Sequence, residues 1–208
     1  MNCDSIIFDL DGTLWDSTEI IYDSWISVLE KLPDIERLPT KEDCAGVMGL
    51  SSEKLMKKLF PALSTERGAE IFQMCSDNEN RILSEHGAIL YDSLIETLET
   101  LSHTYPLFIV SNCGTGYIES FFKAHNTAKY FKDYLSYGAT KLPKSENIQL
   151  LIKRHALKSP IYVGDTLWDY EAATAANTPF IFASYGFGNV PNVPEIHSPK
   201  DLIKLLSV

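Results

Sequence analysis

Short apolar runs recur along the chain and alternate with amphipathic stretches of helical period. A short apolar run bounded by turn residues favours a buried strand. Such runs cover residues 5–10, 107–111, 134–137, 161–164 and 180–183, and helical patterns cover 93–103, 117–125, 146–155 and 168–176. Strands that alternate with helices are typical of a parallel sheet covered on both faces. The pattern therefore predicts an α/β fold with three layers and five parallel strands.

The segment between the first and second apolar runs breaks this alternation. It shows only helical patterns, over residues 17–32, 41–48, 51–60 and 66–83. A crossover between parallel strands needs only about a dozen residues. We therefore predict that residues 1–15 and 84–208 form an α/β core, and that residues 16–83 form a helical cap inserted into it.

Composition and charge restrict the class of partner and the compartment that we expect for the chain. It has 208 residues and a formal net charge of −10, without a basic run, which argues against nucleic acid or an anionic membrane surface as a partner. The sequence shows neither a membrane-spanning apolar segment nor a signal-peptide pattern. Its four cysteines are scattered without C-x-x-C spacing. We expect a reduced, cytoplasmic protein, with the monomer favoured because no apolar surface stripe stands out.

The first apolar run ends in Asp9-Leu10-Asp11-Gly12-Thr13. Side chains on a strand repeat every second residue, so Asp9 and Asp11 start toward the same side. Burying such carboxylates costs several kcal/mol per ion unless a cation or hydrogen bonds compensate. A hard, oxygen-preferring cation such as Mg²⁺ fits this pair. The alternative is an ordinary turn, since Asp and Gly are common turn residues.

Further polar residues follow the later strands, at the sheet edge where α/β folds bind ligands. Ser111-Asn112 follows the second run, and Asp165 and Asp169 follow the fourth. Lys141 and Lys144 both precede the helical pattern that begins near residue 145. Two of these residues have a simpler interpretation. Ser111 could be a helix N-cap, and Asp169 could be a first-turn acid favoured by the helix dipole.

These motifs resemble those of the haloacid dehalogenase superfamily, in particular its phosphoglycolate-phosphatase-like branch, over nearly the whole chain. Asp9–Thr13 resembles the first motif, Ser111 the second, Lys144 the third, and Gly164-Asp165 with Asp169 the fourth. Residues 183–188, Ala-Ser-Tyr-Gly-Phe-Gly, are similar to a stretch common in that branch. The resemblance implies a Rossmann-like sheet with a helical cap. Pro143 departs from the family pattern, in which Pro tends to follow the Lys, so Lys141 stays an alternative to Lys144.

The resemblance also implies catalytic roles. Asp9 would be the nucleophile that forms an aspartyl-phosphate. Asp11 would act as general acid and then general base. Ser111, Asn112 and Lys144 would bind the phosphate and stabilise the charge on its oxygens.

The implied cofactor is Mg²⁺. Asp9, Asp165 and the backbone carbonyl of Asp11 would be its protein ligands. Asp169 would orient Lys144 or a metal-bound water.

The retained Asp11 points to cleavage of a P–O ester, because dehalogenases and phosphonatases of this fold lack or replace it. We expect a Mg²⁺-dependent phosphomonoester hydrolase of a small soluble phosphorylated metabolite, phosphoglycolate or a sugar phosphate. One alternative is a β-phosphoglucomutase-like phosphotransferase, although such enzymes usually show Glu-Asp where this chain has Gly164-Asp165. Another is a non-catalytic sensor that binds a phosphorylated ligand, although such a protein should have lost one of its key aspartates.

The cap is expected to close over the site and to supply specificity. Candidate contacts are the loop 49–51 and a cation from Lys54, Arg67 or Arg81. Trp15, Tyr22 and Trp25, at the boundary of the cap, are expected to serve packing.

Overall fold

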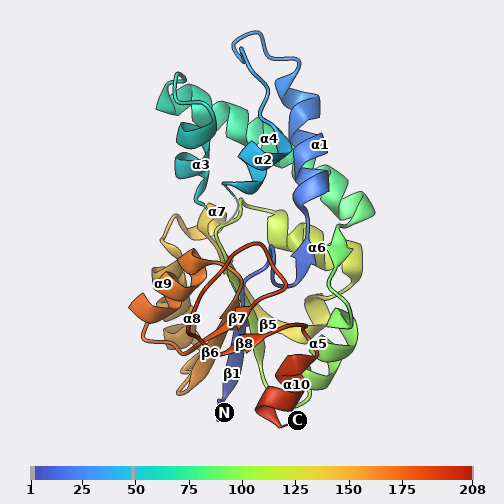
Figure 1. The fold of residues 1–208 in the computed structure, drawn as a ribbon, viewed down its shortest axis with the longest axis vertical. Helices are drawn as coiled ribbons and strands as arrows, with labels where there is room; N and C mark the ends of the chain where they lie inside the picture. Colours follow the sequence, from blue (N-terminus) through green and yellow to red (C-terminus); the bar gives the residue numbers. More distant parts are fainter. Residues whose placement is uncertain (1–2, 48–49, 208) are drawn as a thin grey trace.

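A central parallel sheet organises the computed structural model, which describes residues 3–47 and 50–207 (Figure 1). Its strand order is β5-β4-β1-β6-β7-β8. The strands are β1 (Ser5–Phe8), β4 (Leu107–Ser111), β5 (Phe131–Ser136), β6 (Pro160–Gly164), β7 (Phe180–Ala183) and β8 (Glu195–Ile196). The α/β class and the parallel sheet are confirmed, but the prediction of five strands was one short. The sixth strand, β8, has only two residues and therefore no apolar run to reveal it.

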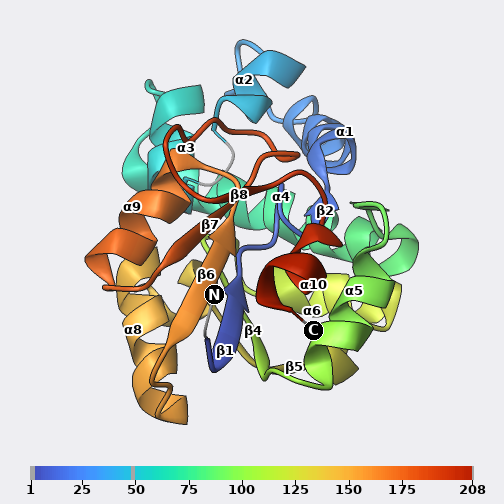
Figure 2. The same ribbon diagram turned by 60° about the horizontal axis from the view of Figure 1, so that its bottom comes forward.

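Helices cover both faces of the sheet (Figure 2). One face carries α5 (Leu94–Ser102), α6 (Tyr117–His125) and α10 (Asp201–Leu206), and the other carries α8 (Lys144–His155) and α9 (Leu167–Ala175). The neighbours Ile6 and Ile7 are both fully buried but belong to the cores on opposite faces, as the two-residue period of a strand requires. Two short elements, η1 (Ala128–Tyr130) and α7 (Tyr137–Thr140), flank β5.

The long segment after β1 is helical. It contains α1 (Thr18–Leu29), α2 (Lys41–Ala45), α3 (Ser52–Leu59) and α4 (Thr65–His86). These helices have a small apolar core of their own, formed by Trp25, Leu29, Met56, Ile71 and Cys75. They lie beyond the carboxyl ends of the strands (Figure 1), where α4 contacts α6. On this packing we propose residues 16–83 as the cap.

The chain leaves and re-enters the core through two adjacent strands. β2 (Trp15–Asp16) pairs antiparallel with β3 (Ile89–Leu90). Two-residue strands give no periodic signal, so the sequence did not predict this pair. The helix that leads back to it, α4, runs to His86, beyond the predicted residue 83, and ends where Gly87 adopts φ +71°. Within the described residues, no helix combines the length and apolarity needed to span a membrane.

The sheet core should dominate stability. Ile109, fully buried in β4, should lose about 2–5 kcal/mol of unfolding free energy when replaced by Ala, because a cavity remains. Ile89, which is 70% exposed, is the matched control and should change by less than about 0.5 kcal/mol. Urea unfolding measures both, and equal losses would contradict this account of the core.

Candidate active site

Three buried aspartates meet at the carboxyl ends of the central strands. Asp9 follows β1, whereas Asp165 and Asp169 follow β6 at the start of α9. Each offers a carboxylate oxygen, and these oxygens lie within 4.8 Å of one another. β1 is a central strand that pairs with β4 on one side and with β6 on the other. Its pairing with β6 brings Asp9 close to Asp165 and Asp169. The arrangement concentrates negative charge at one buried point.

Lys144 is the cation at this point. Its Nζ lies 2.9 Å from Oδ1 of Asp9 and 2.6 Å from Oδ1 of Asp169, and all three side chains are almost fully buried. Lys144 is the first residue of α8, with Pro143 at the N-cap position. Lys141 instead adopts φ +60° at the end of α7 and places its Nζ over the ring of Tyr137. Of the two candidate lysines, only Lys144 thus meets the aspartates.

Asp169 combines both interpretations considered for it. Its Oδ1 accepts a hydrogen bond from Lys144 Nζ. Its Oδ2 accepts from the backbone N–H and the hydroxyl of Thr166, at 2.9 and 2.6 Å, in a capping box at the start of α9. Because both oxygens are already engaged, Asp169 is a poor metal ligand. Asp9 and Asp165 remain the carboxylates best placed to hold a cation.

Asp165 lies in a cradle of glycines. A Cβ added to Gly12, which has φ +78°, would lie 2.0 Å from Oδ2 of Asp165, and one added to Gly186 would lie 2.4 Å from its Cβ. The backbone N–H of Phe187 donates to Oδ2 at 2.8 Å. The stretch 183–188 therefore closes over this carboxylate. Its Gly-x-Gly spacing was the available signal, although no role was predicted for it.

Burial shapes the electrostatics of the cluster. Burial, and then the charge of Asp169, raise the pKa of Asp9, and the same two causes raise the pKa of Asp165. Burial alone would lower the pKa of Lys144, but Asp169 and Asp9 hold it above its ordinary value. The cluster thus holds an ammonium ion firmly and leaves its excess carboxylates in need of a cation or a proton.

Asp11 lies beside the cluster with its carboxylate in a hydrogen-bond network. Oδ1 accepts from Trp15 Nε1 at 2.8 Å, from Ser17 Oγ at 2.5 Å and from Tyr117 Oη at 2.7 Å. Burial raises the pKa of Asp11, and these hydrogen bonds act in the opposite direction. Trp15 is therefore more than a packing residue, contrary to expectation. The network also involves Ser17 and Tyr117, which no sequence motif singled out.

Ser111 is the last residue of β4 and Asn112 follows it, and both face the same space. The alternative of Ser111 as a helix N-cap is not realised, because α6 begins at Tyr117 and Gly116 occupies its N-cap position. Ser111 is buried, and its hydroxyl accepts a long, 3.4 Å hydrogen bond from the N–H of Cys113. Both residues line a small cavity together with Asp9 and Asp11.

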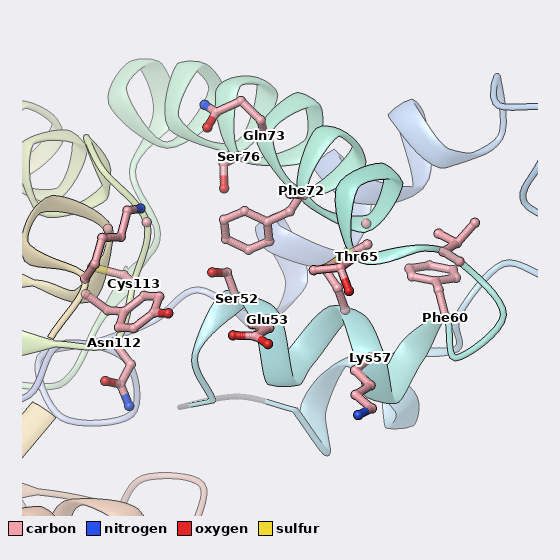
Figure 3. Close-up of a pocket in the computed structure, with 18 of the residues that line it drawn as sticks. Ser52, Glu53, Lys57, Phe60, Thr65, Phe72, Gln73, Ser76, Asn112 and Cys113 are labelled. Atoms are coloured by element: carbon pink, nitrogen blue, oxygen red, sulfur yellow. The ribbon is translucent and has the colours of Figure 1, made fainter. Parts of the chain in front are cut away.

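Two adjoining cavities connect this site to the helical segment. The small one, about 80 Å³, is lined by Asp9, Asp11, Ser111, Trp25, Glu79 and others. A larger one, about 470 Å³, lies between α3, α4 and the loops that follow β4 and β5 (Figure 3). Ser52, Phe72 and residues 112–114 line both cavities.

The expected cap contacts are met only in part. Leu50 lines the small cavity, whereas Gly49 lies outside the described residues. Lys54, Arg67 and Arg81 are absent from the described linings of both cavities, so the predicted cation is not among them. Arg67 and Arg81 pair instead with acidic neighbours at the surface of α4. Helical period explains this, because the face of α4 that carries Phe72, Ser76 and Glu79 is the one turned to the cavities.

A comparison with protein families identifies the chain. The model of haloacid dehalogenase-like hydrolases matches residues 6–183. The chain belongs to this family. A pyrophosphatase PpaX of Listeria monocytogenes is 28% identical to this hydrolase, over 84% of the chain and 80% of the relative. A phosphoglycolate phosphatase of Vibrio parahaemolyticus is 26% identical, over 88% and 85%.

Solved structures agree on the fold of this hydrolase. A haloacid dehalogenase-like hydrolase of Bacteroides fragilis superposes with a TM-score of 0.85 at 23% identity, over 97% of this chain and 100% of that one. The predicted family and the predicted class of enzyme, a phosphatase type of hydrolase with an aspartate nucleophile, are confirmed. The roles of individual residues remain predictions.

The glycine cradle should be intolerant of any side chain. Gly186→Ala would place a Cβ 2.3 Å from the carbonyl oxygen of Gly12, and we expect it to lower the unfolding free energy by about 1–3 kcal/mol. Gly68→Ala, whose Cβ would meet Met56 at an ordinary 3.6 Å inside α4, should instead stabilise by about 0.5–1 kcal/mol. Thermal or urea unfolding tests both, and a neutral Gly186→Ala would refute the close packing.

The acidic cluster should make metal-free protein less stable as pH rises. Carboxyls with raised pKa bind more protons in the folded than in the unfolded state once pH exceeds about 4, so unfolding free energy falls by up to about 1.4 kcal/mol per pH unit for each such group. The decline should continue until the pH exceeds the raised pKa values of Asp9 and Asp165. Unfolding in EDTA across this range is the measurement. Asp165→Asn should flatten the decline, and an unchanged slope would contradict the assignment.

Proposed function

We propose that this hydrolase is a Mg²⁺-dependent phosphatase that cleaves phosphomonoesters of small soluble metabolites through an aspartyl-phosphate on Asp9. The observation that carries the proposal is the buried Asp9 carboxylate, paired with Lys144 and sharing a cavity with Asp11. A nucleophile, a proton donor and a cation are thereby close together.

The donor set fits Mg²⁺. Oδ1 of Asp9 is buried without a hydrogen bond within the described part of the chain, although Lys144 lies at ion-pair distance. Asp9, Asp165 and the backbone carbonyl of Asp11 would hold the ion, an all-oxygen set of the kind that Mg²⁺ prefers. When bound, Mg²⁺ would offset the negative charge of the phosphoryl oxygens and orient the phosphorus toward the nucleophile.

The chemical steps belong to two side chains. A carboxylate oxygen of Asp9 attacks phosphorus, so a P–O bond to the enzyme forms while the ester bond breaks. Asp11 donates a proton to the departing alkoxide, which the burial-raised pKa of this carboxyl favours. Asp11 then accepts a proton from the water that attacks the phosphorus of the aspartyl-phosphate; the P–O bond to Asp9 breaks, phosphate is released and the Asp9 carboxylate is regenerated.

The remaining residues stabilise and position the phosphoryl group. Lys144 would offset charge on its oxygens and is itself held by Asp169. Ser111 and Asn112, in the cavity wall beside Asp9, would bind further phosphoryl oxygens. The candidate substrates are phosphoglycolate, after which one relative is named, and sugar phosphates.

Removing the nucleophile should abolish turnover. In Asp9→Asn we expect phosphate release from a panel of small phosphomonoesters to fall by about 10³-fold or more, because no covalent intermediate can form. EDTA should have a similar effect on the unaltered enzyme, and Mg²⁺ should restore activity. Asp92→Asn, at an exposed position, is the matched control and should keep full activity.

The same assay tests Asp11. Asp11→Asn should slow release by about 10²–10⁴-fold through loss of acid–base catalysis. Its Mg²⁺ affinity should persist, because the backbone carbonyl remains. Release that ignores both the metal and Asp9 would overturn the proposal.

A further inference from the structure

Glu79 is a buried acid that the proposed chemistry does not use. It lies on α4, is only 7% exposed and lines the small cavity together with Asp9 and Asp11. One carboxyl oxygen, Oε2, accepts a hydrogen bond from the indole N–H of Trp25. Among the described residues, Oε1 takes part in no hydrogen bond or ion pair, which leaves it available to a ligand. The helical segment thus places one acidic group above the reacting centre.

The small cavity disfavours negative charge on the part of a ligand that lies away from the phosphoryl group. Among the residues described, its Asp and Glu side chains are Asp9, Asp11 and Glu79, and no Lys or Arg lines it. Of these three acids, Lys144 reaches only Asp9, where it would bind the phosphoryl group. Burial, assisted by the charge of Asp11, raises the pKa of Glu79 to about 8. The same two causes would act on a carboxylate brought in by a ligand, and like charges that meet in a buried site cost affinity.

A phosphomonoester bound for attack by Asp9 must direct its alcohol portion toward this cap residue or past it. A hydroxyl on that portion can donate a hydrogen bond to Glu79 in either protonation state, whereas a carboxylate has no proton to donate and is repelled once Glu79 is ionised. The neighbouring larger cavity agrees with an alcohol of this kind, because neutral hydroxyls and amides form much of its wall, among them Ser52, Thr65, Gln73 and Ser76 (Figure 3). Lys57 and Lys141 also line that cavity, beside Glu53. The Lys57 amino group points away from Phe72 in Figure 3, and Lys141 covers the ring of Tyr137.

We propose that Glu79, in its ionised form, is a specificity-determining residue, which favours phosphomonoesters whose leaving group carries a hydroxyl near the phosphate and rejects those that carry a carboxylate there. This inference rests on the proposed phosphatase function. It separates this enzyme from the substrate after which its phosphoglycolate phosphatase relatives are named.

The test uses two esters that differ in one terminal group. 2-Hydroxyethyl phosphate ends in a hydroxyl and 2-phosphoglycolate ends in a carboxylate, on leaving groups of the same length. At about pH 9, above the pKa of about 8 of Glu79, we expect kcat/KM to favour the hydroxyl ester by about tenfold or more. Glu79→Gln keeps the shape and an acceptor for Trp25 while removing the charge. It should reduce the preference by about tenfold, chiefly by lowering KM for phosphoglycolate.

Glu70→Gln is the matched control, since Glu70 is an exposed acid on the same helix that pairs with Arg67. It should leave the ratio unchanged. A preference for phosphoglycolate in the unaltered enzyme, or a ratio that Glu79→Gln does not move, would overturn the role of Glu79 while the Asp9-dependent, Mg²⁺-dependent phosphatase stands.

The absence of phosphate release from either ester would count against the proposed function instead. Calorimetric binding of the two esters to the Mg²⁺-loaded protein then tests Glu79 directly. Tighter binding of the hydroxyl ester, with the difference lost in Glu79→Gln, supports the inference. Equal or tighter binding of phosphoglycolate overturns it.

Discussion

The ion pairs of Lys144 with Asp9 and Asp169 are the constraint on which the site depends. Taking such charges out of water costs several kcal/mol per ion, and only close, well-directed partners offset this cost. The ammonium therefore has to be delivered accurately, by the first turn of α8, to carboxylates that follow β1 and β6. The parallel pairing of those two strands fixes the separation of the carboxylates. The register of the sheet therefore determines the geometry of the candidate site.

The backbone around the cluster is organised to keep the carboxylates in place. Asp169 is fixed by the capping box of α9, and Asp165 by glycines that admit no side chain and by the N–H of Phe187. These groups hold the acids without neutralising them. A metal ion can then bind without the rearrangement that a flexible set of ligands would need, which is the advantage of a preorganised site.

Much of the architecture could be predicted from the sequence, because buried parallel strands are continuous apolar runs. The runs at 107–111 and 180–183 coincide with β4 and β7. β5 begins at Phe131, three residues before the predicted start, because exposed and polar positions dilute its pattern. β2, β3 and β8 have two residues each, and strands this short are created by tertiary pairing rather than by local propensity.

The sequence predicted those residues of the candidate site that belong to motifs at the ends of predicted strands, such as Asp9 and Asp165. The choice between Lys141 and Lys144 was not predictable, because it depends on where α7 ends and α8 begins. Glu79 was also hidden: it lies in a helix rich in charged residues, where an acid normally faces solvent, and only its packing against Trp25 shows that it is buried. Substrate-facing residues of this kind are selected by shape, which a single sequence does not reveal.

The pairing of β2 with β3 brings the two ends of the helical segment together. The helical segment therefore connects two adjacent antiparallel strands, as the loop of a long hairpin would. Loop-closure entropy grows by only about 0.6 kcal/mol when a flexible loop doubles in length, so the segment can be lengthened, trimmed or exchanged at small cost to the core. Evolution can therefore vary the proposed cap while the sheet that carries the buried acids stays unchanged, and protein engineers can graft caps at the same junction.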